Sequence, residues 1–178
     1  MRPGVKSDEQ SGSRIPGDGA GQSPGRAVTI QQATLADLGS LVSLFDAYRQ
    51  FYGSPPDQDL ARVFLHQRLE RQDSVIFLAK PIVAEQGESP LGFCQIYPTF
   101  CSLLVAPIGV LYDLFVTPVA RRQGVGRELL GEAVTYARAA GYARLDLSTA
   151  QTNRAAQALY EGLGWQRDTT FWVYSLRL

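Results

Sequence analysis

The chain has 178 residues, of which 45% are hydrophobic and 19% are charged. This length and composition predict a single soluble globular domain with a sizeable core. Its 17 basic and 17 acidic side chains give a formal net charge of zero, which argues against a nucleic-acid or anionic-membrane partner. Two cysteines that form no CxxC pair and one histidine do not make a zinc site, so we expect no metal and free thiols in a reducing cytoplasm.

The N-terminal segment differs in composition from the rest of the chain. Residues 1–27 are rich in glycine and proline, contain no aromatic residue and lack the apolar run of a secretory signal. We therefore expect a disordered tail over 1–27 and one folded domain over 28–178. The apolar stretch over 93–112 is interrupted by a glutamine, two prolines and a glycine, which favours strands over a membrane span.

The predicted elements begin with a strand over 28–34, which is rich in β-branched side chains at its start. Thr34 and Asp37 have the spacing of a capping box, which predicts the start of a helix that ends before Gly53. A second helix is expected over 57–71.

Three strands are expected next, over 74–79, 91–98 and 109–118, with a hairpin turn at 85–89. The third of them, "GVLYDLFVTP", has the strongest strand pattern, and we expect it to be buried on both faces of a sheet.

The remaining sequence predicts two helices alternating with two strands. A helix over 125–140 is followed by a strand over 143–149, and Asn153 is a good N-cap for a helix that ends near Gly164. The alternating segment "FWVYSLRL" at 171–178 predicts a final strand. This order of elements predicts an α/β (α+β) domain built in layers.

The segment "ARRQGVGRELL" at 120–130 predicts an anion site. The first amides of a helix lack intrahelical acceptors and lie at the positive end of the helix dipole. Gly124 and Gly126 remove Cβ atoms that would hold a ligand away, while Arg121 and Arg122 add positive charge. The pattern favours a phosphate or pyrophosphate ligand, and the alternative is a plain turn with solvated arginines.

Two motifs together resemble the GNAT N-acetyltransferase superfamily. "LYDLFVTPVARRQGVGRELL" (111–130) is similar to its strand, proline and R-x-x-G-x-G segment, and "STAQTNRAAQALYEGLGW" (148–165) is similar to its second motif. The resemblance covers 28–178 in element order. It implies an acyl-CoA N-acyltransferase fold, with a central mixed, mostly antiparallel sheet flanked by helices, and acetyl-CoA-dependent N-acetyl transfer.

The resemblance also implies where acetyl-CoA would bind. The central strand would part from its neighbour at a bulge, the pantetheine arm would lie in the gap, and the helix amides would hold the pyrophosphate. The implied cofactor-binding residues are Phe115, Val116, Arg121, Arg122, Gln123, Gly124, Val125, Gly126, Arg127 and Asn153.

Two residues are candidates for catalysis. Tyr160 matches the position of the family's donor to the departing sulfur, although its spacing alone fits a core aromatic. Asp113 interrupts the predicted buried strand, and a buried carboxylate needs either an arginine partner or a wet cleft. In a cleft it would bind a cationic substrate or act as a base through water. Substrate binding, a base role and structural pairing all remain open at this point.

The segments "LYDLFV" and "YPTFCS" (97–102) are most similar to the diamine (spermidine/spermine and thialysine-type) acetyltransferase branch. This resemblance implies a small polyamine- or amino-acid-like amine as substrate and a homodimer. That branch usually has an acidic residue where this chain has Tyr112. Aromatic residues could line the amine site through cation–π contacts or belong to the core; they are Tyr48, Tyr52, Tyr97 and Tyr112, together with Phe100.

Two other functions fit the same motifs. One is acetylation of a protein lysine or N-terminus, and the other is a non-catalytic acyl-CoA-binding sensor. Retention of Tyr160 and Asn153 argues weakly against the sensor.

Overall fold

The computed structural model describes residues 27–82 and 89–178. The predicted tail, apart from Ala27, and the predicted turn at 85–89, apart from Ser89, lie outside the described residues.

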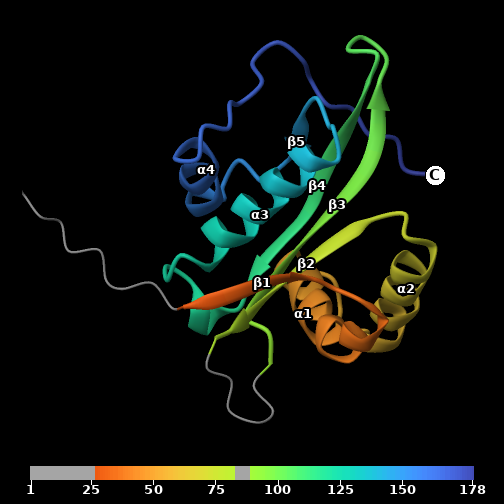
Figure 1. Ribbon diagram of the computed structural model, residues 1–178, viewed down its shortest axis with the longest axis vertical. Helices are drawn as coiled ribbons and strands as arrows, with labels where there is room; N and C mark the ends of the chain where they lie inside the picture. The colour runs from red at the N-terminus through yellow and green to blue at the C-terminus, as the bar shows by residue number, and fades with distance from the viewer. Residues whose placement is uncertain (1–26, 83–88) are drawn as a thin grey trace, which may run out of the picture.

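The described chain forms one five-stranded sheet in the order β1-β2-β3-β4-β5 (Figure 1). The first four strands pair antiparallel, and β5 pairs parallel to β4. The prediction of a mixed, mostly antiparallel sheet is therefore confirmed. The strands are β1 (Val28–Gln32), β2 (Val75–Pro81), β3 (Gly92–Cys101), β4 (Ala106–Val116) and β5 (Leu145–Leu147).

Helices cover both faces of the sheet, with α1 and α2 on one side and α3 and α4 on the other (Figure 1). The predicted capping box forms: the Thr34 N–H donates to Asp37 Oδ2 at 2.9 Å, at the short helix that leads into α1. The helices are η1 (Leu35–Asp37), α1 (Leu38–Phe51), α2 (Gln58–Arg71), η2 (Pro118–Ala120), α3 (Val125–Ala139) and α4 (Arg154–Glu161).

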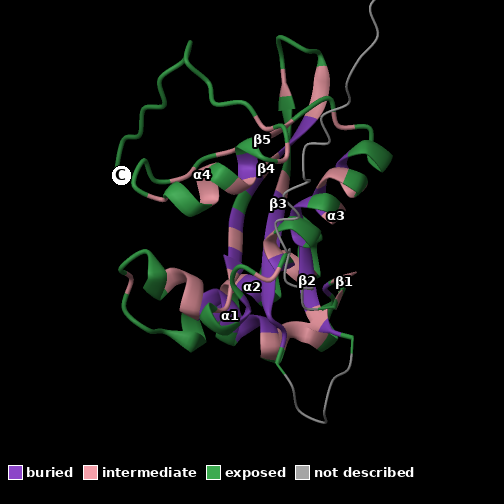
Figure 2. Cartoon of the chain, turned by 90° about the vertical axis from the view of Figure 1, so that its left-hand side faces the viewer, coloured by how far each residue is buried: buried purple, intermediate pink, exposed green. Residues whose placement is uncertain are grey.

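Alternating side chains of the strands build a separate core on each face. On the α1/α2 face, Leu41 and Leu65 pack with Phe93 of the sheet. On the α3/α4 face, Leu129 and Leu130 pack with strand residues that point the opposite way. Buried residues run along β2 and β3 between the two cores (Figure 2). The central strands are therefore buried on both faces, as the apolar runs in the sequence predict.

The hairpin of β3 and β4 is longer than predicted. The two strands pair as far as Cys101 and Ala106, past prolines that we expected to end them. The last β2 residue to pair with β3 is Val75, opposite Ile96, so one edge of β3 has no partner strand beyond that point. A proline is tolerated at such an edge because no ladder hydrogen bond is lost there.

The predicted final strand over 171–178 is wrong: this segment has no regular secondary structure, and its large hydrophobic side chains are 75–112% exposed. Figure 2 shows the C-terminal trace as exposed throughout. Alternation predicts which side chains a strand would bury, but a strand also needs a neighbouring edge to supply hydrogen bonds. Within the described residues this segment pairs with no strand.

Candidate active site

The site starts where β4 separates from β5. The two strands pair only over Gly109–Leu111, opposite Leu145–Leu147, and the rest of β4 pairs with β3 alone. The Thr117 N–H donates to Leu91 O at 2.8 Å, so the backbone of Thr117 faces the β3 side. Because alternate residues face opposite edges, the N–H and C=O groups of Leu114 and Val116 face the gap beside β4, whereas those of Phe115, a predicted cofactor-binding residue, face β3. An extended ligand can bind there as a substitute strand.

A β-bulge lies at the same point, as the resemblance implies. Gln95 pairs with Asp113 and Ile96 pairs with Leu111, so Tyr112 is an extra residue in β4. The bulge turns the Asp113 side chain toward the α1/α2 face. Tyr112 itself is 63% exposed, so the prediction that this strand is buried on both faces is wrong at this residue.

The start of α3 presents free backbone amides, as predicted. Gly124 is the N-cap with φ of +86°, and its carbonyl accepts hydrogen bonds from the N–H groups of Arg127 and Glu128. Among the described residues, the amides of 123–126 have no backbone acceptor. A Cβ atom at Gly124 would meet nothing within 4 Å, so a ligand can approach this backbone closely.

The structure changes the interpretation of the second glycine. A Cβ atom at Gly126 would lie 3.2 Å from Leu159 Cδ2 and 3.8 Å from a methyl group of Val116. This glycine therefore lets α3 pack closely against α4 and β4, and the hypothesis that it makes room for a ligand is not needed to explain it. The neighbouring Val125 is also a core residue, with its side chain 1% exposed.

The basic and polar side chains of this loop have different surroundings. Arg121 donates from Nε to Val116 O at 3.0 Å, and its guanidinium lies over the rings of Phe51 and Phe115, at 5.4 and 5.8 Å. It therefore joins the loop to β4 and α1. Arg122 and Arg127 are both exposed at the start of α3, where positive charge attracts an anion. Gln123 donates to Val119 O at 2.8 Å, which fixes the turn.

Helix α4 positions Asn153 and Tyr160. Asn153 is the predicted N-cap, since its Oδ1 accepts from the Ala156 N–H at 3.3 Å, and this leaves its Nδ2 as a donor. Tyr160 is 9% exposed and packs against Trp165 with ring centroids 6.0 Å apart. Burial, with smaller contributions from Tyr52 and Cys94, raises the pKa of Tyr160 to about 12. The phenol therefore keeps its proton at neutral pH and is a hydrogen-bond donor.

Asp113 is 8% exposed, and no lysine or arginine of the described residues forms an ion pair with it. Burial raises the pKa of Asp113 and the nearby Tyr48 hydroxyl partly offsets this rise, which leaves the pKa at about 6. Of the alternatives that the sequence leaves open, pairing with an arginine is not seen. A carboxylate with a pKa close to the pH of the cell is suited to exchange a proton.

Two tyrosines lie beside this carboxylate, and two more pack against them. Burial and, after it, the charge of Asp113 raise the pKa of both Tyr48, on α1, and Tyr97, on β3, so Asp113 lies near both. Tyr48 donates to Tyr112 O at 3.3 Å, its ring lies 5.2 Å from that of Tyr52, and the rings of Tyr97 and Tyr112 meet at 5.5 Å. The structure thus brings together the four predicted substrate-binding tyrosines. Phe100 is 82% exposed near the hairpin tip, so it belongs neither to the core nor to this cluster.

One polar residue of the site was missed by sequence reasoning. Gln95 is fully buried and directly opposite Asp113 in the register of β3 and β4. Its Nε2 donates to Ser74 Oγ at 2.7 Å, while its Oε1 is buried without a hydrogen-bond partner. The sequence does contain a signal, because Gln95 is a polar residue inside the apolar run "FCQIY".

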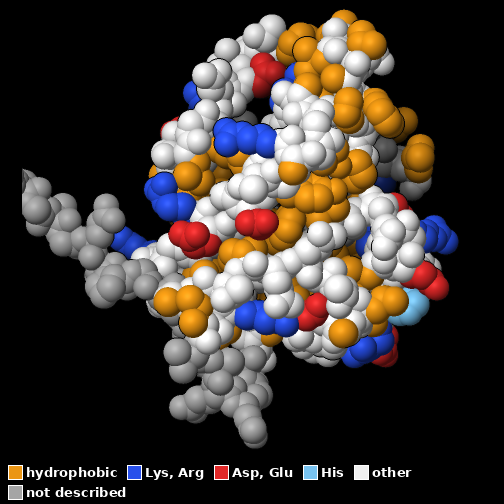
Figure 3. Space-filling view, in the orientation of Figure 1, with side chains coloured by type: hydrophobic (Ala, Val, Ile, Leu, Met, Phe, Trp, Pro, Cys, Tyr) orange, Lys and Arg blue, Asp and Glu red, His pale blue; other side chains and the backbone are white. Residues whose placement is uncertain are grey.

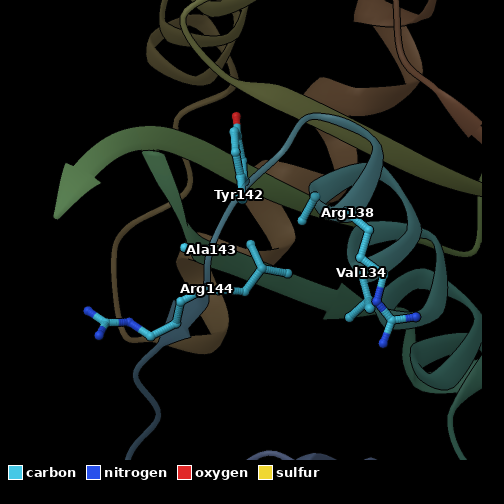
Figure 4. Close-up of a pocket in the computed structure, with 7 residues that line it drawn as sticks. Val134, Arg138, Tyr142, Ala143 and Arg144 are labelled. Carbon is cyan, nitrogen blue, oxygen red and sulfur yellow. The ribbon is translucent and has the colours of Figure 1, made fainter. Parts of the chain in front are cut away.

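A separate cavity of about 170 Å³ lies between the end of α3 and the start of β5. Val134, Ala137 and Leu145 form its apolar wall, and Figure 4 shows that Arg138 and Arg144 extend away from each other at its sides. It shares no residue with the site around Asp113.

In the part of the chain that the structure describes, no three His, Cys, Asp or Glu side chains gather as a group able to hold a metal ion. No helix over 27–82 or 89–178 has both the length and the apolarity needed to cross a membrane. Cys94 and Cys101 are free thiols, as predicted.

Comparison with known proteins agrees with this geometry. The chain is 42% identical over 151 residues to the "Uncharacterized N-acetyltransferase YhfO" of Bacillus subtilis, a match that covers 85% of this chain and 98% of that protein. A crystal structure of a probable acetyltransferase superposes with a TM-score of 0.76 at 41% identity, over 84% of this chain and 97% of that one.

A more distant structure shares the fold alone. Aminoglycoside N-acetyltransferase AAC(6')-Iy, in complex with CoA, has a TM-score of 0.68 at 19% identity and covers 85% of this chain and 96% of that one. The family model described as Acetyltransferase (GNAT) family matches residues 41–165, which include α1, the β4 bulge, the start of α3 and Tyr160. The chain therefore belongs to the Acetyltransferase (GNAT) family and is an N-acetyltransferase.

Proposed function

We propose that this enzyme transfers an acetyl group from acetyl-CoA to the primary amine of a small polyamine- or amino-acid-like molecule. The observation that carries the proposal is the surroundings of Asp113: a carboxylate only 8% exposed, without a basic partner among the described residues, near four tyrosines. Such a carboxylate is costly to keep ionised unless a cation joins it. A protonated amine supplies that cation, and the tyrosine rings add cation–π attraction.

The residues around the gap in the sheet fit acetyl-CoA, which supplies the acetyl group as a reactive thioester. The amides of 123–126 would bind the pyrophosphate, with charge from Arg122 and Arg127. The backbones of Leu114 and Val116 would pair with the pantetheine arm, and Asn153 Nδ2 would donate to it. Arg121, bound to Val116 O, would hold the loop in place for this contact.

Asp113 and Tyr160 would handle the protons of the reaction. Transfer to an ammonium group forms a C–N bond and breaks a C–S bond, and nitrogen loses two protons. One must leave before attack so that nitrogen has a free electron pair, and Asp113, directly or through water, would take it and release it to solvent. The other is needed by the departing sulfur, and the Tyr160 hydroxyl would pass it on as a hydrogen-bond donor.

The test is a panel of amines, with release of the CoA thiol as the readout and mass spectrometry of the products. The panel would contain linear diamines, polyamines, basic amino acids and monoamines of matched length. We expect the highest kcat/KM for small cationic primary amines. Absence of turnover with every amine, in protein that binds acetyl-CoA, would favour a sensor instead.

A second candidate function is acetylation of a protein or peptide amine. The observation that favours it is the tip of the β3–β4 hairpin, where Phe100, Leu103 and Val105 are 82%, 91% and 91% exposed. Figure 3 shows hydrophobic side chains gathered over this end of the molecule. A larger acceptor could bind this surface while its amine reaches Asp113. Unstructured peptides with a free N-terminus or lysine would then be acetylated with a lower KM than small amines.

We also propose a homodimer in a reducing, cytoplasmic environment. Among the described strands, β5 has β4 as its partner, so its other edge is free to pair. The exposed segment 171–178 of one copy would pair with this edge of the other copy. Light scattering of the full chain and of a chain that ends at residue 170 tests this. The same number of chains per particle in both proteins would contradict it.

A further inference from the structure

Gln95 has an unusual position for a buried amide. It is fully buried in the middle of β3, and its side chain lies on the α1/α2 face because its neighbour Cys94 packs in the opposite core. Asp113 lies directly across the ladder on the same face, with Cβ atoms of such pairs about 5 Å apart. The Gln95 amide is therefore within reach of the carboxyl group.

The hydrogen bonds of Gln95 are unbalanced. Its Nε2 donates to Ser74 Oγ at 2.7 Å, and its Oε1 is a buried acceptor with no donor among the described residues. A buried acceptor without a partner is unfavourable, because it loses water and gains nothing. The neighbouring group able to correct this is Asp113, whose carboxyl group is a donor when protonated and only an acceptor when ionised.

We propose that Gln95 is a positioning residue whose amide reverses with the protonation state of Asp113. With Asp113 protonated, its O–H donates to Gln95 Oε1 and Nε2 donates to Ser74, which is the amide orientation seen in the structure. With Asp113 ionised, the amide turns by 180°, Nε2 donates to the carboxylate and the Ser74 hydroxyl donates to Oε1. Every polar group then has a partner in both states.

The tyrosines and the cysteine near Asp113 support this assignment because they stay neutral. Burial raises the pKa of Tyr48 on α1 and of Tyr97 and Cys94 on β3, so none of them ionises near neutral pH. Tyr52 on α1 and Tyr160 on α4 add to the rise in the pKa of Tyr48. The charge of Arg68 on α2 lowers the pKa of Tyr97 and so opposes the effect of burial there. Arg68 is itself paired with Asp73, with its Nε atom 2.8 Å from Asp73 Oδ1. Asp113 is thus the group of this cluster whose charge changes near pH 6.

The role in catalysis rests on the proposed function, in which Asp113 takes a proton from the acceptor and releases it in each cycle. A neighbour that satisfies only one protonation state would favour that state and slow the cycle. A neighbour that reverses serves both states and keeps the carboxyl group oriented throughout.

The first experiment titrates the Asp113 carboxyl carbon by ¹³C NMR in the free enzyme, so it does not depend on turnover. In Gln95→Met, which keeps the length of the side chain and removes both polar groups, we expect the midpoint to rise by about one pH unit, because the charge-assisted hydrogen bond that the carboxylate loses is stronger than the neutral one that the protonated acid loses. Ser74→Ala should shift it in the same direction by less. An unchanged midpoint in folded Gln95→Met protein would overturn the proposal.

The matched control is Ile96→Val, which shortens a fully buried side chain next to Gln95 but on the opposite core. It should lower the melting temperature without moving the Asp113 midpoint. If Ile96→Val moves the midpoint as far as Gln95→Met does, the effect is one of packing and the proposal fails.

The kinetic readout separates this proposal from the proposed function. In Gln95→Met the acidic limb of the kcat/KM profile should move up by the same amount as the NMR midpoint, with an unchanged affinity for CoA. If the NMR midpoint moves but the acidic limb of the kcat/KM profile does not, Asp113 is not the base. That result would contradict the proposed chemistry and leave the pairing of Gln95 and Asp113 intact.

Discussion

The two faces of the sheet differ in what they bury. All four buried polar or charged residues of the described chain (Asp46, Ser74, Gln95 and Asp113) lie on the α1/α2 side, where Asp113 points toward Tyr48. The α3/α4 side packs apolar residues such as Leu129 and Ala133, with Tyr160 at its margin. The α1/α2 face therefore contains the buried polar and titratable side chains, while the α3/α4 face offers mainly backbone groups for a ligand to bind.

This division has a physical reason. Phosphates and an extended pantetheine arm are recognised by amides and by a strand edge, which need close approach and few side chains. An amine that must lose a proton needs a titratable group in a low-dielectric site, and that requires a buried side chain. If the two faces are separate, a substitution on one face should leave the ligand of the other face bound as in the parent protein.

The largest expected effect is on Asp113. Asp113→Asn keeps the shape of the side chain and removes the charge, so kcat/KM for an amine should fall by about 10³-fold. CoA affinity, measured by calorimetry, should stay within a factor of two or so because the cofactor face is untouched. If the variant keeps most of its activity, Asp113 is not the base, and water or another group has that role.

The same carboxyl group should limit stability above its pKa. The pKa of Asp113 rises from the ordinary 3.8 to about 6 in the folded chain, so the folded state holds its proton more tightly than the unfolded state. The free energy of unfolding should therefore fall as the pH rises from about 4 to about 6, by about 3 kcal/mol in total, and then stay level.

Asp113→Asn lacks this titration and should be more stable than the parent above pH 6. Urea unfolding of both proteins at pH 4, 6 and 8 measures the difference. Parallel stability profiles would show that the carboxyl group is not buried as described.

Tyr160 tests the boundary between the two faces. Tyr160→Phe keeps the ring in its packing against Trp165 and removes the hydroxyl, so kcat should fall by about 10²-fold with little change in CoA affinity. Single-turnover kinetics and calorimetry measure the two effects. Full activity would mean that the thiolate is protonated by other means, and loss of folding would identify Tyr160 as a core residue only.

The smallest effect is expected at the start of α3. Gly124→Ala places a methyl group where a ligand would approach, at a φ of +86° that costs an alanine about 1 kcal/mol. CoA affinity should fall by about tenfold, while the titration of Asp113 stays unchanged. The matched control is Gly131→Ala within α3, whose added Cβ also meets nothing within 4 Å but needs no strained backbone. It should bind CoA as the parent does and be slightly more stable.

Sequence patterns predicted most of the fold because they are local. The capping box of Thr34 and Asp37, the N-cap of Asn153 and the glycine N-cap of α3 each depend on a few neighbouring residues. Apolar spacing located five strands and four helices to within a few residues. These features were predictable because the backbone and side chains that satisfy one another lie within one or two turns.

Features that depend on contacts between distant segments were not predictable. The alternation at 171–178 gave no information on whether an edge would be there to pair with it, and Gly126 was explained only by the approach of Leu159. The function of Asp113 depends on a one-residue bulge at Tyr112, which turns the carboxyl group toward Tyr48 and Gln95. The sequence by itself thus determined the order of the elements and the anion-binding start of α3, whereas the neighbours of each buried polar side chain were decided by strand register. The reason is that shifting the register by one residue exchanges the two faces of a strand.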